Sequence, residues 1–279
     1  MTAPSNPKAP EGDLATFEHE HFTHDGATHD VYRKGKGPAV LVLTELPGIS
    51  PQVLGFADRV VALGCTAVLP NLFGTAGRDP FESKVSGVLY GLSSMVGACI
   101  SKEFTVFATG RSSPAVDWLR ALAASEHQRC GGPGVGVVGM CFTGGFALAM
   151  AADARVLAPV MSQPSLPFPL TQSRRRAIDC DPATLDVVAQ RCDREGLRVM
   201  GLRFKGDPLV PEERFQLLRE RLGEGFVAVE LEQADGHPEG PLKKHHSVLT
   251  GALIDAPGEP TRAALDRVLQ LFRDKLLAA

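Results

Sequence analysis

Short apolar segments alternate along this chain with longer segments in which apolar residues recur every three or four positions. The short apolar segments predict buried strands, and the longer periodic segments predict helices. This alternation predicts an α/β fold in which helices cover both faces of a mostly parallel sheet. The expected strands cover residues 38–45, 66–69, 135–139, 156–161, 198–204 and 226–231, and the expected helices cover residues 53–63, 114–125, 146–152, 211–222 and 260–277.

Two further segments, residues 17–23 and 28–33, flank an Asp25-Gly26 turn and predict an antiparallel hairpin ahead of the parallel sheet. The 279 residues show no internal repeat and no linker, so we expect a single domain over residues 14–279. Residues 1–13 are rich in Pro and small polar residues, which predicts a flexible N-terminal tail. Two long stretches, residues 75–113 and 162–195, follow strand ends, and we expect them to form loops around the site.

Composition narrows the class of protein. A hydrophobic fraction of 44% with 22% charged residues is typical of a globular protein, and a net charge of −3 favours neither nucleic acid nor an anionic membrane as a partner. No uninterrupted apolar stretch has the length of a membrane helix. The six cysteines form no Cys-x-x-Cys pair, which argues against a zinc cluster or a disulfide framework. We therefore expect a cytoplasmic protein with a small-molecule substrate, and the sequence leaves open whether it forms a homo-oligomer.

The most informative stretch is residues 135–152. A Val-rich segment stops at a Gly-x-Cys turn and continues as a helix-forming segment. A strand, a sharp turn and a helix with a nucleophile at the apex form the nucleophile elbow of α/β hydrolases. This pattern predicts Cys141 as the nucleophile, and Gly139 and Gly144 as the residues that let the helix pack tightly against the strand. The alternative is a buried cysteine on an ordinary strand-to-helix turn.

The order nucleophile, acid, histidine can be tested along the chain. Asp207 follows an apolar segment and precedes a predicted helix, as the acid should, although an Asp before Pro is also common in turns. Two histidines then compete for the role of general base. His237 comes sooner after the last predicted strand, whereas His246 follows some residues later. The adjacent His245, after a Lys-Lys pair, is expected to be solvated.

With these motifs the chain resembles the dienelactone hydrolase family, whose elbow reads Gly-x-Cys-x-Gly-Gly. Residues 139–144 match this pattern except that Thr143 replaces a glycine. Residues 44–49 match the family's strand end at its glutamate, here Glu45. Residues 58–64 and 70–73 match a helix and the following strand end, with Asn71 where Asp is usual. Residues 207–211 and 246–247 are similar to the family's acid loop and its His-Ser motif.

The resemblance implies an α/β-hydrolase fold and a Cys-His-Asp hydrolase of esters or lactones. It favours His246 over His237 as the base, with the segment 236–244 as an insertion before it. Cys141 would form a thioester acyl-enzyme, and His246 would transfer protons while Asp207 orients it. The backbone N–H groups of Phe142 and Leu46 would bind the oxyanion. Another role concerns Glu45, which in the family contacts the resting cysteine and helps to activate it. A structural carboxylate bonded to backbone amides is the alternative for Glu45.

The absence of an arginine that the family uses limits the substrate prediction. The namesake enzymes bind a substrate carboxylate with two arginines, one of them shortly after the catalytic histidine, but the residues after His246 include none. Arg111 or the run Arg174 to Arg176 could bind an anion, although we expect the run to be a solvated surface. Residues 162–169, with three prolines and Phe168, predict a rigid apolar pocket wall. We therefore expect an ester or lactone hydrolase of open substrate, with a catalytically silent ligand-binding protein of the same fold as the alternative.

Four histidines lie in or beside the predicted hairpin: His19, His21, His24 and His29. His19 and His21 share one side of a strand, but no Cys or His-Glu-x-x-His spacing accompanies them. The sequence therefore predicts a solvated hairpin without a metal. The expected hydrolysis requires no metal and no organic cofactor.

Overall fold

The structure is a computed structural model of the chain and describes residues 8–79, 113–237 and 245–278. Eight strands form one sheet in the order β1-β2-β4-β3-β5-β6-β7-β8. The pairs β1–β2 and β2–β4 are antiparallel, and all the other neighbours are parallel. The strands are β1 (Glu18–His24), β2 (Ala27–Gly35), β3 (Ala39–Leu43), β4 (Thr66–Pro70), β5 (Val135–Met140), β6 (Val156–Ser162), β7 (Val199–Phe204) and β8 (Phe226–Leu231).

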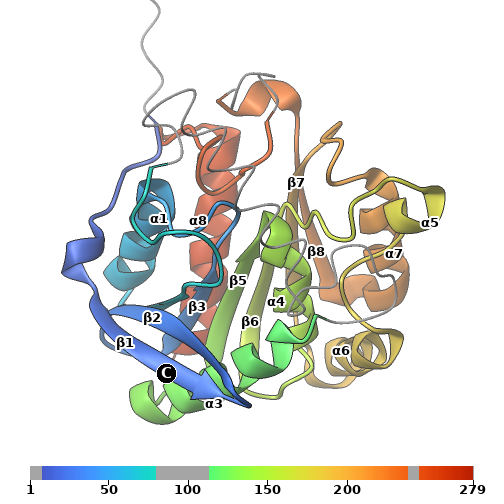
Figure 1. Cartoon of the computed structure of the whole chain (residues 1–279). Coiled ribbons are helices and arrows are strands. Elements are labelled where there is room, and N and C mark those ends of the chain that lie inside the picture. The colour runs from blue at the N-terminus through green and yellow to red at the C-terminus, as the bar shows by residue number, and fades with distance from the viewer. Residues whose placement is uncertain (1–7, 80–112, 238–244, 279) are drawn as a thin grey trace, which may run out of the picture.

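Helices lie on both faces of this sheet (Figure 1). One apolar cluster joins the sheet to α3, α4, α6 and α7, and a second joins it to α1 and α8. The predicted α/β-hydrolase architecture, a mostly parallel sheet between helical layers, is confirmed. The α-helices are α1 (Pro51–Ala62), α3 (Ala115–Cys130), α4 (Gly144–Met150), α5 (Gln172–Arg175), α6 (Pro182–Glu195), α7 (Glu212–Leu222) and α8 (Pro260–Phe272).

The remaining helical turns are short. They are η1 (Leu14–Thr16), η2 (Cys141–Thr143), η3 (Gly223–Gly225), η4 (Gln233–Asp235) and a π-helical turn, η5 (Arg273–Leu277). The last of these continues α8, so the single helix expected over residues 260–277 changes its winding at Arg273. Across the described ranges, no helix combines the length and apolar character that a membrane-spanning segment requires.

Two helices, α5 and α6, are absent from the sequence prediction. α6 lies within the stretch 162–195, which we expected to form loops. Its N-terminus carries ordinary signals, because the Asp181 side chain accepts a hydrogen bond from the Thr184 N–H and Pro182 occupies the first turn. Its buried face, however, includes Arg191, whose guanidinium donates to the carbonyl oxygens of Ala151 and Val156. This arginine interrupts the apolar stripe by which a helix is found in a sequence.

Residues 8–13 of the expected N-terminal tail contact the folded domain. Lys8 forms a β-bridge with Ile254, and the Gly12 N–H donates to the Pro51 carbonyl over 2.8 Å. Gly55 in α1 permits this contact, since a Cβ on it would lie 1.9 Å from the Pro10 carbonyl oxygen. The segment 8–13 therefore packs against the start of α1. Residues 1–7 of the expected tail, and most of the expected loop 75–113, lie outside the described residues.

Candidate active site

Cys141 lies where β5 ends and the chain turns into η2 and α4. Its backbone has a φ of 53°, a left-handed conformation that residues with side chains rarely adopt and that often marks functional turns. The turn is so tight that a Cβ on Gly139 would lie 2.1 Å from the Thr143 carbonyl oxygen. We expected Gly144 to allow close packing of the helix on the strand. Its close neighbour is instead Pro164, in the loop after β6, because a Cβ on Gly144 would lie 2.6 Å from it.

Thr143, which departs from the family pattern, fastens this turn to the sheet. Its buried hydroxyl accepts from the Met140 N–H over 2.9 Å and lies 2.9 Å from the carbonyl oxygen of Leu43 at the end of β3. A glycine at position 143 could make neither bond. Thr143 therefore links the elbow to the neighbouring strand through its side chain.

Asp207 and His246 meet at the carboxyl ends of the parallel strands, where Cys141 also lies. Asp207 follows β7 and is buried, and His246 lies in the segment beyond β8. The distance between His246 Nδ1 and Asp207 Oδ2 is 2.6 Å, and the Leu209 N–H donates to the other carboxylate oxygen over 2.9 Å. Strands β5, β7 and β8 are parallel, so their carboxyl ends lie on the same side of the sheet. Asp207 and His246 follow two of these strand ends, and Cys141 follows the third.

The His246 imidazole is strongly coupled to its surroundings. Burial opposes its charged form, but the interaction with the Cys141 sulfur and the hydrogen bond to Asp207 outweigh burial and raise the pKa of His246 well above its ordinary value. The contact with Asp207 also fixes the orientation of the ring, since Nδ1 faces the carboxylate and Nε2 lies on the other side of the ring. This arrangement can hold a proton on the ring and deliver it at Nε2.

His237 and His245 make other contacts in the structure. The backbone N–H of His237 donates to the Ala252 carbonyl, and the carboxylate of Asp207 is bonded to His246. His245 is not the solvated neighbour that we expected. Its Nδ1 lies 3.1 Å from Gln233 Oε1, and its ring packs against Phe204 with the ring centroids 5.6 Å apart.

Ser165 is a residue that the sequence analysis did not single out as part of the site. It is fully buried in the loop after β6, and its Oγ lies 3.3 Å from Cys141 Sγ. Its backbone N–H also donates to the Cys141 carbonyl over 3.0 Å. No motif marks this position, because the contact depends on how the loop returns over the elbow.

Glu45 lies in a buried polar network rather than among backbone amides. Gln163 Nε2 donates to Glu45 Oε2 over 3.0 Å, and the Thr250 hydroxyl donates to Oε1. The Val248 N–H donates in turn to Gln163 Oε1 over 3.3 Å. These contacts tie the strand end at Glu45 to the segment just after His246. The part of the chain that the structure describes gives the Glu45 carboxylate no hydrogen bond to Cys141, and its role in activating the thiol stays a prediction.

Arg214 fixes the loop that carries Ser165. This arginine is fully buried in α7, and it donates to the carbonyl oxygens of Pro164, Pro167 and Ala177 over 2.6 Å each. Burial lowers the pKa of Arg214 to about 10, which still leaves it charged at neutral pH. The buried Arg214 cation therefore holds residues 162–169, the expected rigid pocket wall, through backbone carbonyl oxygens, and no carboxylate of the described residues forms an ion pair with it.

Of the arginines considered for anion binding, Arg175 and Arg176 form ion pairs. Arg175 forms an ion pair with Glu213 at 2.8 Å, and Arg176 pairs with Glu220, both on α7. These two ion pairs connect α5 to α7, so the run Arg174 to Arg176 is not the purely solvated surface that we expected. Arg111 lies outside the described residues.

The fold and this site define the class of α/β hydrolases. The model of the dienelactone hydrolase family matches residues 26–198, which is more than half of the chain. This chain belongs to the dienelactone hydrolase family and is a hydrolase. None of the curated proteins matches it.

Solved structures agree on the fold. The chain is similar to a dienelactone hydrolase-like promiscuous phosphotriesterase from metagenomic libraries, with 16% identity, a TM-score of 0.57 and coverage of 94% of this chain and 98% of that one. It is also similar to DcsB, solved with its substrate analogue, with 15% identity, a TM-score of 0.56 and coverage of 94% and 100%. A third similar structure is the 2,6-dihydroxy-pseudo-oxynicotine hydrolase, with 17% identity, a TM-score of 0.52 and coverage of 92% and 69%.

Proposed function

We propose that this hydrolase cleaves carboxylic ester or lactone bonds with Cys141 as nucleophile, His246 as proton carrier and Asp207 as the group that orients His246. The observation that carries the proposal is the 2.6 Å contact between His246 and Asp207 at the strand edge that bears Cys141. The order of the three residues along the chain supports it, since it is the order of α/β hydrolases.

In the first half of the reaction the Cys141 thiolate attacks the carbonyl carbon, and a C–S bond forms while the carbonyl oxygen becomes an oxyanion. The N–H groups of Phe142 and Leu46 stabilise that oxyanion, and one such donor is typically worth about 3 kcal/mol in the transition state. The C–O bond to the leaving group then breaks, and the imidazolium of His246 protonates the departing alkoxide. The product is a thioester on Cys141.

In the second half His246 removes a proton from water, and the hydroxide attacks the thioester carbonyl. The C–S bond breaks, the acid product leaves, and the thiolate and imidazolium are restored. The raised pKa of His246 suits both halves, because the ring can keep a proton beside the sulfur at neutral pH.

The surroundings of the site favour an uncharged acyl group. His246 is followed by Ser247 and then by the buried Val248 and Leu249, where the namesake enzymes place an arginine for a substrate carboxylate. The loop 162–169 holds Ser165 beside Cys141, its Pro164 packs against Gly144 of the elbow, and its Leu166 is buried. We infer a neutral or apolar ester or lactone as the substrate class.

Hydrolysis of p-nitrophenyl acetate tests the proposal. The wild type should release p-nitrophenol with a burst, and Cys141→Ala should lose at least about 10³-fold in rate. Cys130→Ala is the matched control: Cys130 is a partly exposed free thiol at the end of α3, and burial raises its pKa, so its removal should leave turnover unchanged. If the wild type and Cys141→Ala hydrolyse the ester equally slowly, the chain is a catalytically silent binding protein.

A further inference from the structure

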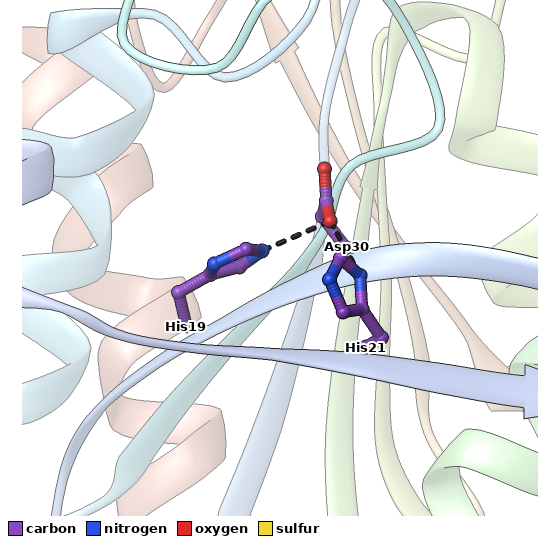
Figure 2. Close-up of side chains that lie close together, drawn as sticks. All are labelled: His19, His21 and Asp30. Carbon is purple, nitrogen blue, oxygen red and sulfur yellow. Dashed lines mark hydrogen bonds and ion pairs between the residues drawn. The ribbon is translucent and has the colours of Figure 1, made fainter.

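The β1–β2 hairpin gathers two imidazoles and a carboxylate on one face. In its register His21 lies opposite Asp30, and His19 lies opposite Tyr32. Alternate residues of a strand point to the same side, so His19 and His21 lie on the side of Asp30. Figure 2 shows both imidazole rings directed at the Asp30 carboxylate. The carboxylate comes from the second strand, which is why the spacing of the histidines alone did not reveal it.

The contacts within this cluster are unusually convergent. His19 Nε2 lies 2.9 Å and His21 Nδ1 lies 2.8 Å from the same atom, Asp30 Oδ1. All three donor atoms lie within 4.8 Å of one another. The three side chains can therefore direct one donor atom each at a common position between them.

The spacing suits a small cation after a modest adjustment. Zinc binds imidazole nitrogen and carboxylate oxygen at about 2.0–2.2 Å, so two donors of a tetrahedral site lie about 3.3 Å apart. Each imidazole nitrogen, now 2.8–2.9 Å from Asp30 Oδ1, must then move about 0.5 Å away from that oxygen. The imidazoles of His19 and His21 are 44% and 68% exposed, which leaves them room to move. Each ring would carry its proton on the nitrogen that faces away from Asp30.

The surrounding hairpin holds the donors in place. Tyr32 stacks on His19 with the ring centroids 4.9 Å apart and an interplanar angle of 19°. The backbone carbonyl of Asp30 accepts from the Asn71 N–H over 2.8 Å, which anchors β2 to the chain beyond β4. Donors that are already gathered lose little conformational entropy when a ligand binds.

We propose that His19, His21 and Asp30 form a binding site for a divalent transition-metal cation of the zinc type. Two imidazoles and one carboxylate favour Zn²⁺, Ni²⁺ or Cu²⁺ over Mg²⁺ and Ca²⁺, which prefer all-oxygen sites. The cation would keep at least one coordination position toward solvent, because only three side chains supply donors. This site lies at the β1 edge of the sheet, whereas Asp207 and His246 follow strands at the opposite edge, so it does not depend on the proposed hydrolysis.

A Zn²⁺ titration of the full chain, followed by competition with a chromophoric chelator, tests this site. All variants carry Cys141→Ala, so that the thiol beside His246 cannot bind the metal. The parent variant should bind Zn²⁺ in a one-to-one complex that excess Mg²⁺ does not displace. Adding His19→Gln with His21→Gln should lower the affinity by at least about tenfold. His24→Gln is the control on the same hairpin, and it should bind like the parent.

Several results would overturn the proposal. They are an affinity that the double substitution leaves unchanged, an equal loss in His24→Gln, and the absence of a one-to-one complex in the parent. Circular dichroism of each variant checks that it is folded, and since all three histidines lie on an exposed hairpin we expect folding to be preserved. The imidazole resonances of His19 and His21 should also shift together on addition of Zn²⁺, which a site elsewhere in the chain would not cause.

Discussion

His246 Nδ1 lies 2.6 Å from Asp207 Oδ2, although 39 residues separate the two along the chain. One comes from the loop after β7 and the other from the segment beyond β8, so the contact exists only in the folded sheet. The carboxylate is fixed on its far side by the Leu209 N–H. Asp207 is thus a rigid acceptor that sets the orientation of the imidazole, and the predictions below follow from that relationship.

Replacement of His246 should stop hydrolysis, and replacement of His237 should not. His246→Ala removes the group that carries protons between Cys141 and the substrate, and general acid–base catalysis is typically worth about 10²–10⁴-fold in rate. The measurement is kcat/KM for p-nitrophenyl acetate. His237→Ala is the matched control, because the Asp207 carboxylate contacts the His246 ring, whereas the His237 bond to Ala252 uses a backbone N–H that alanine keeps. An inactive His237→Ala enzyme beside an active His246→Ala enzyme would reverse the assignment.

Asp207→Asn should change the pH profile as well as the rate. The carboxylate helps to raise the pKa of His246, so the wild-type ring keeps its proton, and its ability to protonate the leaving group, until the pH rises through that raised value. Without the negative charge the pKa of His246 falls, and the alkaline limb of kcat/KM should move to lower pH. The rate at the optimum should drop by roughly 10²–10⁴-fold.

Asp186→Asn serves as the control for this experiment. Asp186 is an exposed acid on α6 that pairs with Arg221, so it alters the net charge by the same amount without touching the site. Its profile should overlay that of the wild type. An alkaline limb that stays in place in Asp207→Asn would show that the carboxylate does not tune the imidazole.

Thr143→Val should destabilise the protein. The substitution keeps the shape of the side chain but leaves the buried N–H of Met140 without its acceptor, and an unsatisfied buried group costs about 1–3 kcal/mol. Urea unfolding followed by circular dichroism measures the change in free energy. Thr23→Val on the exposed strand β1 is the control and should stay within about 0.5 kcal/mol of the wild type. Equal stabilities of Thr143→Val and the wild type would show that the hydroxyl does not anchor the elbow.

The sequence predicted most of the fold because the buried strands are nearly uniform in apolar residues. All six residues of β5 are buried, for example, and no other element type explains such a short apolar run between turn residues. The prediction failed where a polar side chain does the packing. Arg191 is buried in α6 by donating to backbone carbonyls, so the helix shows an interrupted apolar face.

For the candidate site, the sequence identified residues that stand in motifs and missed those that depend on tertiary contacts. Cys141 was predicted from the elbow and Asp207 from a strand end, whereas only the resemblance to the family's His-Ser motif favoured His246 over His237. Ser165 has no motif, since its contact with the sulfur arises from the path of a proline-rich loop. Asp30 was overlooked beside His19 and His21 for a similar reason, because it faces them from a neighbouring strand.

The most direct test of the account is the chemical identity of the acyl-enzyme. The full chain is mixed with p-nitrophenyl acetate, quenched in acid during the burst and digested, and the peptides are analysed by mass spectrometry. One acetyl group should be found on the peptide that contains Cys141. An acetyl group on Ser165 or on another cysteine, or a burst without any labelled peptide, would contradict the assignment of Cys141 as the nucleophile.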